Sequence, residues 1–444
     1  MADTSPDNVD GGRGMHARSA RDTAPRLPDV RKPDGADTDL LAWIAPRRDD
    51  VERDLCAHGA LLLRGFTMRW TADLEALAAI IGGPLMDYRD RATPRRSVSG
   101  RVFTSTETPR RYHIPMHNEN AFASTWPLRL IFHCIRPADN GGCTPLADAR
   151  RVCARIDPEV RRRFADRGVL YVRNFGHGPG MQWREAFQVQ TREQLEQACD
   201  TAGIEYTWLG DDRLRTRQRC RADAVHPRTG EAVWFSHVTS LHMTSLDPTL
   251  RDTMLRQLGE ENLPHNAYYG DGAPIEATTL DHIRDAYNAE MVRFDWQAGD
   301  TLLIDNMLTA HGRDPYEGQR QVVTVLSGPT TWRDIDRPGH GDDVRAVQES
   351  SSHVVSSTPP LSAPSTAVGA TEIRPLLLAI LAEVLEVASV DLDDNFFELG
   401  GDSLTATRVI SKVRERTNID LPLAAFFNVS SVRELVDLAC DASD

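Results

Sequence analysis

Two stretches of this sequence, HNENAF at 117–122 and LTAHGRDPYEGQR at 308–320, decide how the rest of the chain is interpreted. The first places His117 and Glu119 two residues apart, and the second carries His311. Side chains two residues apart lie on the same side of an extended segment, so His117 and Glu119 can face one common partner. The question that these stretches raise is whether they meet at a single metal ion.

Two imidazoles and one carboxylate are the ligand set with which non-haem Fe(II) oxygenases hold iron, and this set leaves one face of the metal open. Taken singly, each histidine is better explained as an ordinary hydrogen-bonded core or surface residue than as a metal ligand. A second pair, His340 and Asp342, lies in a stretch rich in Pro and Gly where no strands can fix a ligand geometry, so we reject it.

The composition is that of an acidic globular protein of 444 residues, long enough for about two to three domains. The net charge of −14 argues against nucleic acid or an anionic membrane as a partner, because both repel an acidic surface. Seven cysteines without a CxxC pair indicate neither a disulfide framework nor a zinc site. Without a signal-peptide h-region or an apolar run of roughly 18 residues, we expect a cytoplasmic protein.

The amino-acid composition and the apolar pattern of the N-terminal part change near residue 40. Residues 1–36 are rich in Asp, Gly, Arg and Pro with few large apolar side chains, which predicts a disordered leader. Residues 40–58 show a helical apolar period, and residues 60–63 read as a short buried strand.

Many short β-like runs follow between 97 and 335, separated by turn residues and by helices expected at 192–202 and 248–258. Many strands with inserted helices predict a β-sandwich or barrel, an α+β or mainly β fold, over residues 37–336. The β-like runs include LRLIFHCI, AVWFS, VRFDW, TLLID and RQVVTVLSG.

The C-terminal part reads as a linker and a small all-α bundle. Residues 337–370 are rich in Ser, Pro and Thr without a sustained period, which predicts a flexible linker. Residues 371–444 have apolar side chains at helical spacing, and Ser431 followed by Glu434 is a capping-box start for a last helix. The apolar residues at this spacing are Leu377, Ile380, Leu381, Val384, Leu385 and Ala388, and then Ala406, Val409, Ile410 and Val413.

Residues from about 40 to 335 resemble the taurine dioxygenase family of Fe(II)/2-oxoglutarate oxygenases. The resemblance implies a double-stranded β-helix, or jelly roll, whose open end holds iron. It also implies Fe(II) bound by His117, Glu119 and His311, with 2-oxoglutarate as cosubstrate. The sequence segments on which this resemblance rests occur in the same order as in the family. They are HGALLLRGF at 58–66, HNENAF, GGCTPLAD at 141–148, HPRTGEAVWF at 226–235 and DNMLTAHGRDPYEGQR at 305–320.

The resemblance assigns further residues to the cosubstrate. Arg320 matches the arginine that holds the far carboxylate of 2-oxoglutarate, a role that suits a planar bidentate donor. Thr144 matches a threonine that also bonds 2-oxoglutarate, and Arg313 is an alternative to Arg320. Without the family context, Arg320 reads as an ordinary strand arginine and Thr144 as a turn residue beside two glycines.

Glu119 stands where many members of the family have aspartate. A glutamate here resembles the branch of syringomycin-type aspartate hydroxylases, which act on carrier-bound amino acids. Halogenases bind chloride only where a small residue leaves this coordination position vacant, so an acid at this position argues against halogenation.

The segment FFELGGDSLTATRV at 396–409 resembles the 4′-phosphopantetheine attachment site of peptidyl carrier proteins in nonribosomal peptide synthesis. Ser403 would carry the arm, because Gly400 and Gly401 allow a tight turn into a helix whose start exposes the hydroxyl. The plain alternative makes Ser403 only a helix cap. A carrier domain over 371–444 implies a phosphopantetheinyl transferase, an adenylating enzyme that loads the arm in trans, and other synthetase modules as partners.

These expectations combine into one hypothesis, in which an amino acid or related acyl thioester on Ser403 is hydroxylated at its β-carbon. Two alternatives stay open. The oxygenase can act on a free amino acid or perform desaturation or epoxidation, which need the same ligands. The chain can also be a non-catalytic carrier or docking protein with a vestigial oxygenase fold, although the presence of all three ligands and Arg320 weighs against this.

Overall fold

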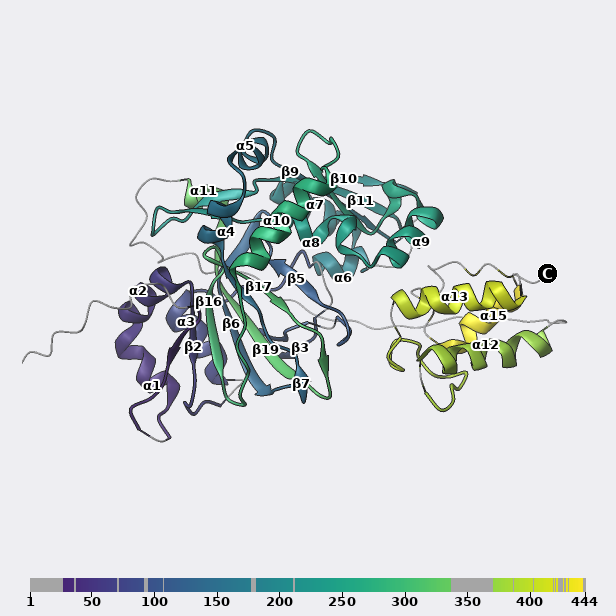
Figure 1. Cartoon of the computed structure of the whole chain (residues 1–444), viewed down its shortest axis with the longest axis horizontal. Coiled ribbons are helices and arrows are strands. Elements are labelled where there is room, and N and C mark those ends of the chain that lie inside the picture. Colours follow the sequence, from purple (N-terminus) through teal and green to yellow (C-terminus); the bar gives the residue numbers. More distant parts are fainter. Residues whose placement is uncertain are drawn as a thin grey trace, which may run out of the picture.

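The computed structural model describes residues 27–336 and 370–441, apart from short gaps. Most of the predicted leader, nearly all of the predicted linker and the rejected pair of His340 and Asp342 lie outside the described residues. Figure 1 shows a β-rich body and, beside it, the helices of the C-terminal region. The gaps are at 36, 70–71, 92–94, 107, 177–180, 211, 386, 402, 418, 420, 422–425, 427–428 and 430.

Two mainly antiparallel sheets form the centre of the body (Figure 1). The major sheet consists, in spatial order, of β1 (Asp29–Arg31), β2 (Ala60–Leu63), β16 (Thr301–Asp305), β6 (Thr125–Arg136), β19 (Gln321–Thr331), β4 (Val102–Thr104) and β3 (Ser97–Ser99). The minor sheet consists of β15 (Met291–Val292), β8 (Leu146–Asp148), β17 (Thr309–Arg313) and β5 (Ile114–His117). Leu146 and Val292 of the minor sheet pack into the apolar core on one face of the major sheet, so the sheets face each other. The predicted jelly roll is confirmed.

Alternating side chains of the major sheet enter two different cores, because successive residues of a strand point to opposite faces. Leu62 of β2 packs toward the minor sheet, whereas Leu61 and Leu63 pack against N-terminal helices. The helix and strand predicted within residues 40–63 are confirmed. These helices are α1 (Leu40–Ile44), η1 (Ala45–Arg47), α2 (Arg48–His58) and α3 (Ala72–Gly82).

A second β-layer with helices is inserted between the strands of the jelly roll. Its sheet has the order β10 (Glu205–Trp208), β11 (Leu214–Cys220), β9 (Val169–Phe175) and β14 (His265–Tyr269). The helices expected at 192–202 and 248–258 are confirmed as α7 and α9. The helices of this region are α4 (Ala149–Arg155), α5 (Pro158–Arg167), α6 (Trp183–Phe187), α7 (Arg192–Ala202), α8 (Val238–Leu241), η2 (Met243–Ser245), α9 (Pro248–Leu258), η3 (Glu260–Asn262) and α10 (Ala277–Glu290).

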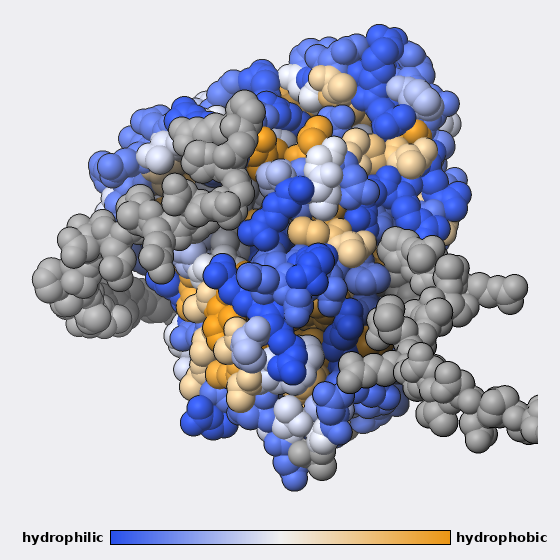
Figure 2. Space-filling model, turned by 90° about the vertical axis from the view of Figure 1, so that its left-hand side faces the viewer, coloured by the Kyte–Doolittle hydropathy of each residue, from blue (hydrophilic) through white to orange (hydrophobic). Residues whose placement is uncertain are grey.

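Smaller elements complete the body. Two small antiparallel sheets pair β12 (Asp223–Val225) with β13 (Ala232–Trp234) and β7 (Asn140–Gly141) with the sequence-distant β18 (Tyr316–Glu317). The helix α11 (Trp332–Ile335) follows β19. Figure 2 shows the face away from the C-terminal helices, where hydrophilic residues cover most of the described surface between smaller hydrophobic patches. Among the described helices, none combines the length and the apolar character that a membrane span requires.

The C-terminal region contains the expected helices. They are α12 (Ala370–Leu385), α13 (Ser403–Thr417) and α15 (Val432–Asp441), the last beginning directly after Ser431. Most residues predicted at helical spacing, among them Leu377, Ile380, Val409 and Val413, are buried in one apolar cluster, and the partly buried Leu385 packs against it. Ala388 is exposed and lies beyond the end of α12, so its inclusion in the helical pattern was wrong. The sequence pattern therefore located this bundle correctly.

Two sequence interpretations are wrong in part. The predicted leader extended to residue 36, yet β1 lies within it and pairs in parallel with β2. An edge strand is stabilised by backbone hydrogen bonds, so it needs no apolar run that a sequence would reveal. The run VRFDW was expected as a strand, but only Val292 belongs to one, in the two-residue β15.

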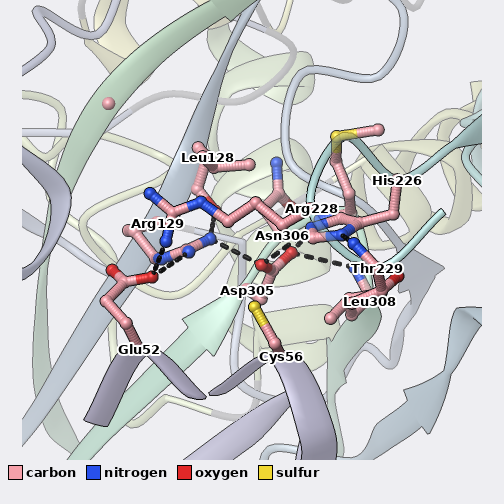
Figure 3. A network of polar contacts seen from close by, with 12 residues as sticks. Glu52, Cys56, Leu128, Arg129, His226, Arg228, Thr229, Asp305, Asn306 and Leu308 are labelled. Carbon is pink, nitrogen blue, oxygen red and sulfur yellow. Dashed lines mark hydrogen bonds and ion pairs between the residues drawn. The ribbon is translucent and has the colours of Figure 1, made fainter. Parts of the chain in front are cut away.

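A buried polar network ties β16 to β6 and to α2 (Figure 3). Asp305, at the end of β16, accepts a 2.5 Å hydrogen bond from Nη1 of Arg129 and lies 3.1 Å from Nε2 of His226. Arg129 also donates to Glu52 of α2 at 2.8 Å. Burial opposes the ionised form of Asp305, but the charges of Arg129 and His226 and the hydrogen bonds to the carboxylate together outweigh burial and lower the pKa of this carboxyl. The other oxygen of Asp305 accepts from two backbone N–H groups of the next turn, which fixes the entry into β17.

The replacement Asp305→Asn should destabilise the fold by roughly 3 kcal/mol, because it leaves the buried guanidinium of Arg129 without one of its counter-charges. Urea unfolding followed by tryptophan fluorescence measures this change. The control is Asp336→Asn, which breaks a half-exposed ion pair with Arg221 and should cost less than about 1 kcal/mol. Equal costs for both variants would contradict the importance of the network.

Candidate active site

Two histidines face each other across neighbouring strands of the minor sheet. His117 is the last residue of β5 and His311 lies in the middle of β17, and they are direct partners in the antiparallel register. Their ring centroids are 4.5 Å apart. Strand pairing thus brings together the two histidines that the sequence separates.

Glu119 reaches the same place from a turn and not from the extended segment that the sequence analysis assumed. β5 ends at His117, and Asn120 has a positive φ of 56°. The side-chain amide of Asn306 holds this turn: its Oδ1 accepts from the backbone N–H of Glu119 at 2.7 Å, and its Nδ2 donates to the Glu119 carbonyl at 2.9 Å. The assumption of strand alternation at this point was wrong, and Asn306 supplies the actual reason for the convergence.

The three side chains can hold one metal ion. One ligand atom from each of His117, Glu119 and His311 lies within 4.8 Å of the others. Burial lowers the pKa of both imidazoles and so favours their neutral, metal-binding form. Burial alone would raise the pKa of Glu119, but the charges of Arg95, His117 and His311 and the hydrogen bond from Tyr88 together outweigh it and bring this pKa to about 2. Two neutral nitrogens and one carboxylate suit a ferrous ion.

Two buried side chains orient the carboxylate of Glu119. Tyr88 donates its hydroxyl to Oε1 at 2.7 Å, and Arg95 donates from Nη2 to Oε2 at 2.7 Å. Nε and Nη1 of Arg95 have no hydrogen-bond partner among the described residues, and the guanidinium lines the pocket. Arg95 can therefore also donate to a bound anion.

The structure brings Arg320 and Thr144 together, as the sequence predicted. Nη2 of Arg320 lies 3.3 Å from Oγ1 of Thr144, which also accepts from Nε1 of Trp296 at 3.1 Å. The other hydrogen bonds of Arg320 go to neutral oxygens of Gly142 and Ser105. Partial burial lowers the pKa of Arg320, and no acidic side chain in the described chain pairs with it. A half-buried guanidinium without a counter-charge favours the binding of a carboxylate.

Arg313, the alternative to Arg320, has a different environment. Its guanidinium donates to the backbone carbonyls of Thr108, Pro109 and Tyr112 at 2.7–2.9 Å. These bonds engage both terminal nitrogens of Arg313, and only Nε lacks a partner among the described residues, so Arg313 holds the loop beside the pocket. The geometry favours Arg320 as the cosubstrate residue.

One pocket of about 390 Å³ joins these groups. His237, whose ring centroid is 5.0 Å from that of His117, is part of its wall, and burial lowers the pKa of His237 to about 3. The pocket is large enough for a cosubstrate and a small substrate group. Residues along its wall include His117, Glu119, His311, Thr144, Arg320, Tyr88, Arg95, His237, Leu246 and Leu250.

The sequence analysis missed several residues of this site. Asn306 lies within the motif segment that begins DNML, and His237 follows the segment that ends AVWF. A search for polar side chains in or next to these motif segments could therefore have found both residues. Tyr88 and Arg95 lie in a stretch without a motif. Only the fold places these two beside Glu119.

A jelly roll whose pocket combines two neutral imidazoles, a carboxylate and an unpaired buried arginine defines a non-haem Fe(II)/2-oxoglutarate oxygenase. The chain belongs to the taurine catabolism dioxygenase TauD, TfdA family, which matches residues 22–326. Residues 375–439 match the phosphopantetheine attachment site family. The protein is therefore an oxygenase that uses Fe(II) and 2-oxoglutarate, fused to a domain that carries phosphopantetheine.

Several known proteins are similar to parts of the chain. Dapdiamide synthesis protein DdaC of Enterobacter agglomerans is 39% identical over 280 residues, 63% of this chain and 85% of that protein. A clavaminate synthase-like protein of Arabidopsis thaliana is 30% identical over 60% of this chain and 81% of that protein. Isonitrile lipopeptide synthase of Mycobacterium tuberculosis is 51% identical over 59 residues, 13% of this chain and 2% of that protein. The crystal structure of PvcB from Pseudomonas aeruginosa matches with a TM-score of 0.41 at 14% identity, over 67% of this chain and 84% of that chain.

The replacement Asn306→Ala should weaken metal binding by roughly 10- to 100-fold, because the turn that presents Glu119 loses its side-chain support. Anaerobic titration with Fe(II), or with Co(II) as a spectroscopic substitute, measures the affinity. Asn174→Ala is a matched control, since Asn174 is also buried and donates to two backbone carbonyls but does not line the pocket. The account of Asn306 fails if both variants bind metal equally well.

Proposed function

We propose that this protein hydroxylates the β-carbon of an amino acid, or a related acyl group, held as a thioester on the phosphopantetheine of Ser403. The observation that carries the proposal is that one chain combines a 2-oxoglutarate oxygenase pocket with a phosphopantetheine-carrying domain. An adenylating enzyme acting in trans and a phosphopantetheinyl transferase are the partners that this proposal requires.

His117, Glu119 and His311 hold the iron in this proposal. With 2-oxoglutarate and oxygen, the bound iron supplies the oxidising chemistry, in which 2-oxoglutarate becomes succinate and carbon dioxide. Tyr88 and Arg95 fix the carboxylate of Glu119 so that it offers one defined geometry to the metal. Phe132, whose ring centroid is 5.3 Å from that of His311, gives this part of the wall an apolar surface.

Arg320 binds the far carboxylate of 2-oxoglutarate in this proposal, and Thr144 donates its hydroxyl to the same carboxylate. Trp296 donates to Oγ1 of Thr144 and so leaves the hydroxyl proton of Thr144 free to point toward the cosubstrate. The support for this role is the burial of Arg320 beside Thr144 without an acidic partner among the described residues.

Ser403 is the attachment point in this proposal because of its place at the start of α13. Gly400 has a φ of +91°, a conformation that favours glycine. A Cβ on Gly401 would lie 2.4 Å from the carbonyl oxygen of Phe396, so a larger residue does not fit there. These constraints support a tight turn that presents the first residue of α13.

The replacement Arg320→Lys should raise KM for 2-oxoglutarate by roughly 10- to 100-fold with a smaller change in kcat, because lysine cannot form the bidentate contact. Succinate formation at varied 2-oxoglutarate measures both constants. Arg136→Lys is the control, since Arg136 lies at the end of β6 and bonds Gln319 at the surface. An unchanged KM in Arg320→Lys would remove Arg320 from the cosubstrate site.

Intact-protein mass spectrometry tests the overall reaction. A phosphopantetheinyl transferase and synthetic aminoacyl-coenzyme A conjugates, one for each proteinogenic amino acid, load the full chain at Ser403. After addition of Fe(II), 2-oxoglutarate and oxygen, at least one loaded form should gain the mass of one oxygen atom. Ser403→Ala should not become loaded, and loaded His311→Ala should gain no oxygen.

Loss of two hydrogens instead of a gain of oxygen would identify desaturation. Oxidation of free amino acids only would contradict the proposal and support the untethered alternative. A chain that forms no succinate in any loaded state would support a non-catalytic carrier or docking protein.

A further inference from the structure

The C-terminal helices share an apolar cluster with the oxygenase. Leu250 and Met254 of α9 and Leu263 belong to the cluster that contains the core of the carrier helices. In Figure 1, α13 lies beside α9, and the two helices are in contact. Leu250, Met254 and Leu258 follow one another at four-residue spacing and therefore form one face of α9.

This face of α9 requires a partner. Leu250 and Met254 are buried in one cluster with the carrier helices, and Leu246, Leu255 and Leu258 pack against the same cluster. An apolar helix face left in water would lose the free energy that this burial supplies. The carrier domain of the same chain is the partner that covers it.

A polar contact fixes the position of α13 on this surface. Nη2 of Arg111 lies 3.2 Å from Oγ1 of Thr405, two residues after Ser403. Thr405 is 2% exposed whereas Arg111 is exposed, so the contact is partly buried. Arg111 belongs to the loop whose carbonyls are held by Arg313, and that loop also borders the pocket.

The docking surface and the pocket share residues. Leu246 and Leu250 pack in the cluster that includes the carrier helices, and both also line the pocket that contains His117 and His311. An arm that leaves the start of α13 would therefore begin beside a wall that continues to the proposed metal site.

We propose that α9 (Pro248–Leu258), the preceding residues 243–247 and Arg111 form a docking surface for the chain's own carrier domain, so that the loaded arm of Ser403 enters the pocket of the same molecule. This inference rests on the proposed function for the identity of the cargo. The docking surface itself does not depend on catalysis and can be tested without it.

Hydrogen exchange on the full chain tests the surface. Met254→Asp places a charge in the apolar contact and should make the peptide that covers α13 exchange several-fold faster than in the wild type. Arg111→Glu should have the same effect through loss of the contact with Thr405. Arg256→Asp is the control, because Arg256 lies on the exposed side of α9 and should leave α13 unchanged.

Peptides that cover β16 and β17 must exchange as in the wild type, so that a local effect is distinguished from unfolding. Equal exchange of α13 in the wild type, Met254→Asp and Arg111→Glu would overturn the docking surface. This outcome is independent of whether the enzyme oxidises any cargo.

A mixture of two inactive variants tests delivery within one molecule. Ser403→Ala keeps the oxygenase pocket but has no arm, and His311→Ala can be loaded with the aminoacyl conjugate that the wild type oxidises. At micromolar protein, tethering gives roughly a thousandfold higher effective concentration than mixing, so oxidation in the mixture should be far slower than in the wild type. Oxidation at the wild-type rate would overturn delivery in cis. If the wild type oxidises no conjugate, the proposed function fails, while the exchange result still decides the surface.

Discussion

The bond between the side chain of Asn306 and the backbone of Glu119 is the interaction on which the site depends. It joins the turn after β5 to the turn before β17, and both strands carry a histidine that faces the other. The neighbouring residue, Asp305, anchors the same turn to Arg129 and thus to the centre of the major sheet. Two adjacent polar residues therefore connect the fold to the geometry of three metal-binding side chains.

Charge pairing separates the arginines of the interior into two groups. Arg129 and Arg95 are buried against carboxylates, at 2.5 Å from Asp305 and 2.7 Å from Glu119. Arg320 is half-buried against neutral oxygens only, within the described residues. Because partial burial of a charge without a counter-ion is costly, the environment of Arg320 favours the binding of an anion. Arg313 also bonds neutral oxygens only, but its bonds of 2.7–2.9 Å go to backbone carbonyls, whereas Arg320 contacts the hydroxyls of Thr144 and Ser105 at 3.3 and 3.4 Å. These longer contacts are the physical reason to place the cosubstrate at Arg320.

Much of the fold and the site could be predicted from local sequence. Regular apolar periods predicted the helices at 192–202 and 248–258 and the strand at 60–63, because these elements bury a defined face. The edge strand β1 and the partners Tyr88 and Arg95 could not be predicted. A backbone pairing leaves no apolar pattern, and a contact between residues distant in sequence depends on the completed fold. The position of Glu119 was predicted for a wrong reason, since a turn and not strand alternation brings it to the histidines.

The carrier helices pack against apolar residues of α9 in the oxygenase. Apolar residues of α9 serve two purposes, because they bind the carrier helices and continue into the wall of the pocket. Weak docking is sufficient in such an arrangement, since the two domains belong to one chain and their effective concentration is high. In this account, an acidic protein needs no extended interface to select its cargo; the covalent arm and the pocket provide the selection.

The most direct measurement of the central claim is the absorption spectrum of the anaerobic full chain with Fe(II) and 2-oxoglutarate. Chelation of ferrous iron by this keto acid produces a visible charge-transfer band. The account predicts this band in the wild type and its absence in His117→Ala, Glu119→Ala and His311→Ala, each of which must remain folded. A wild-type spectrum without the band, or a band of full intensity in the three folded variants, would contradict a ferrous site built from these side chains.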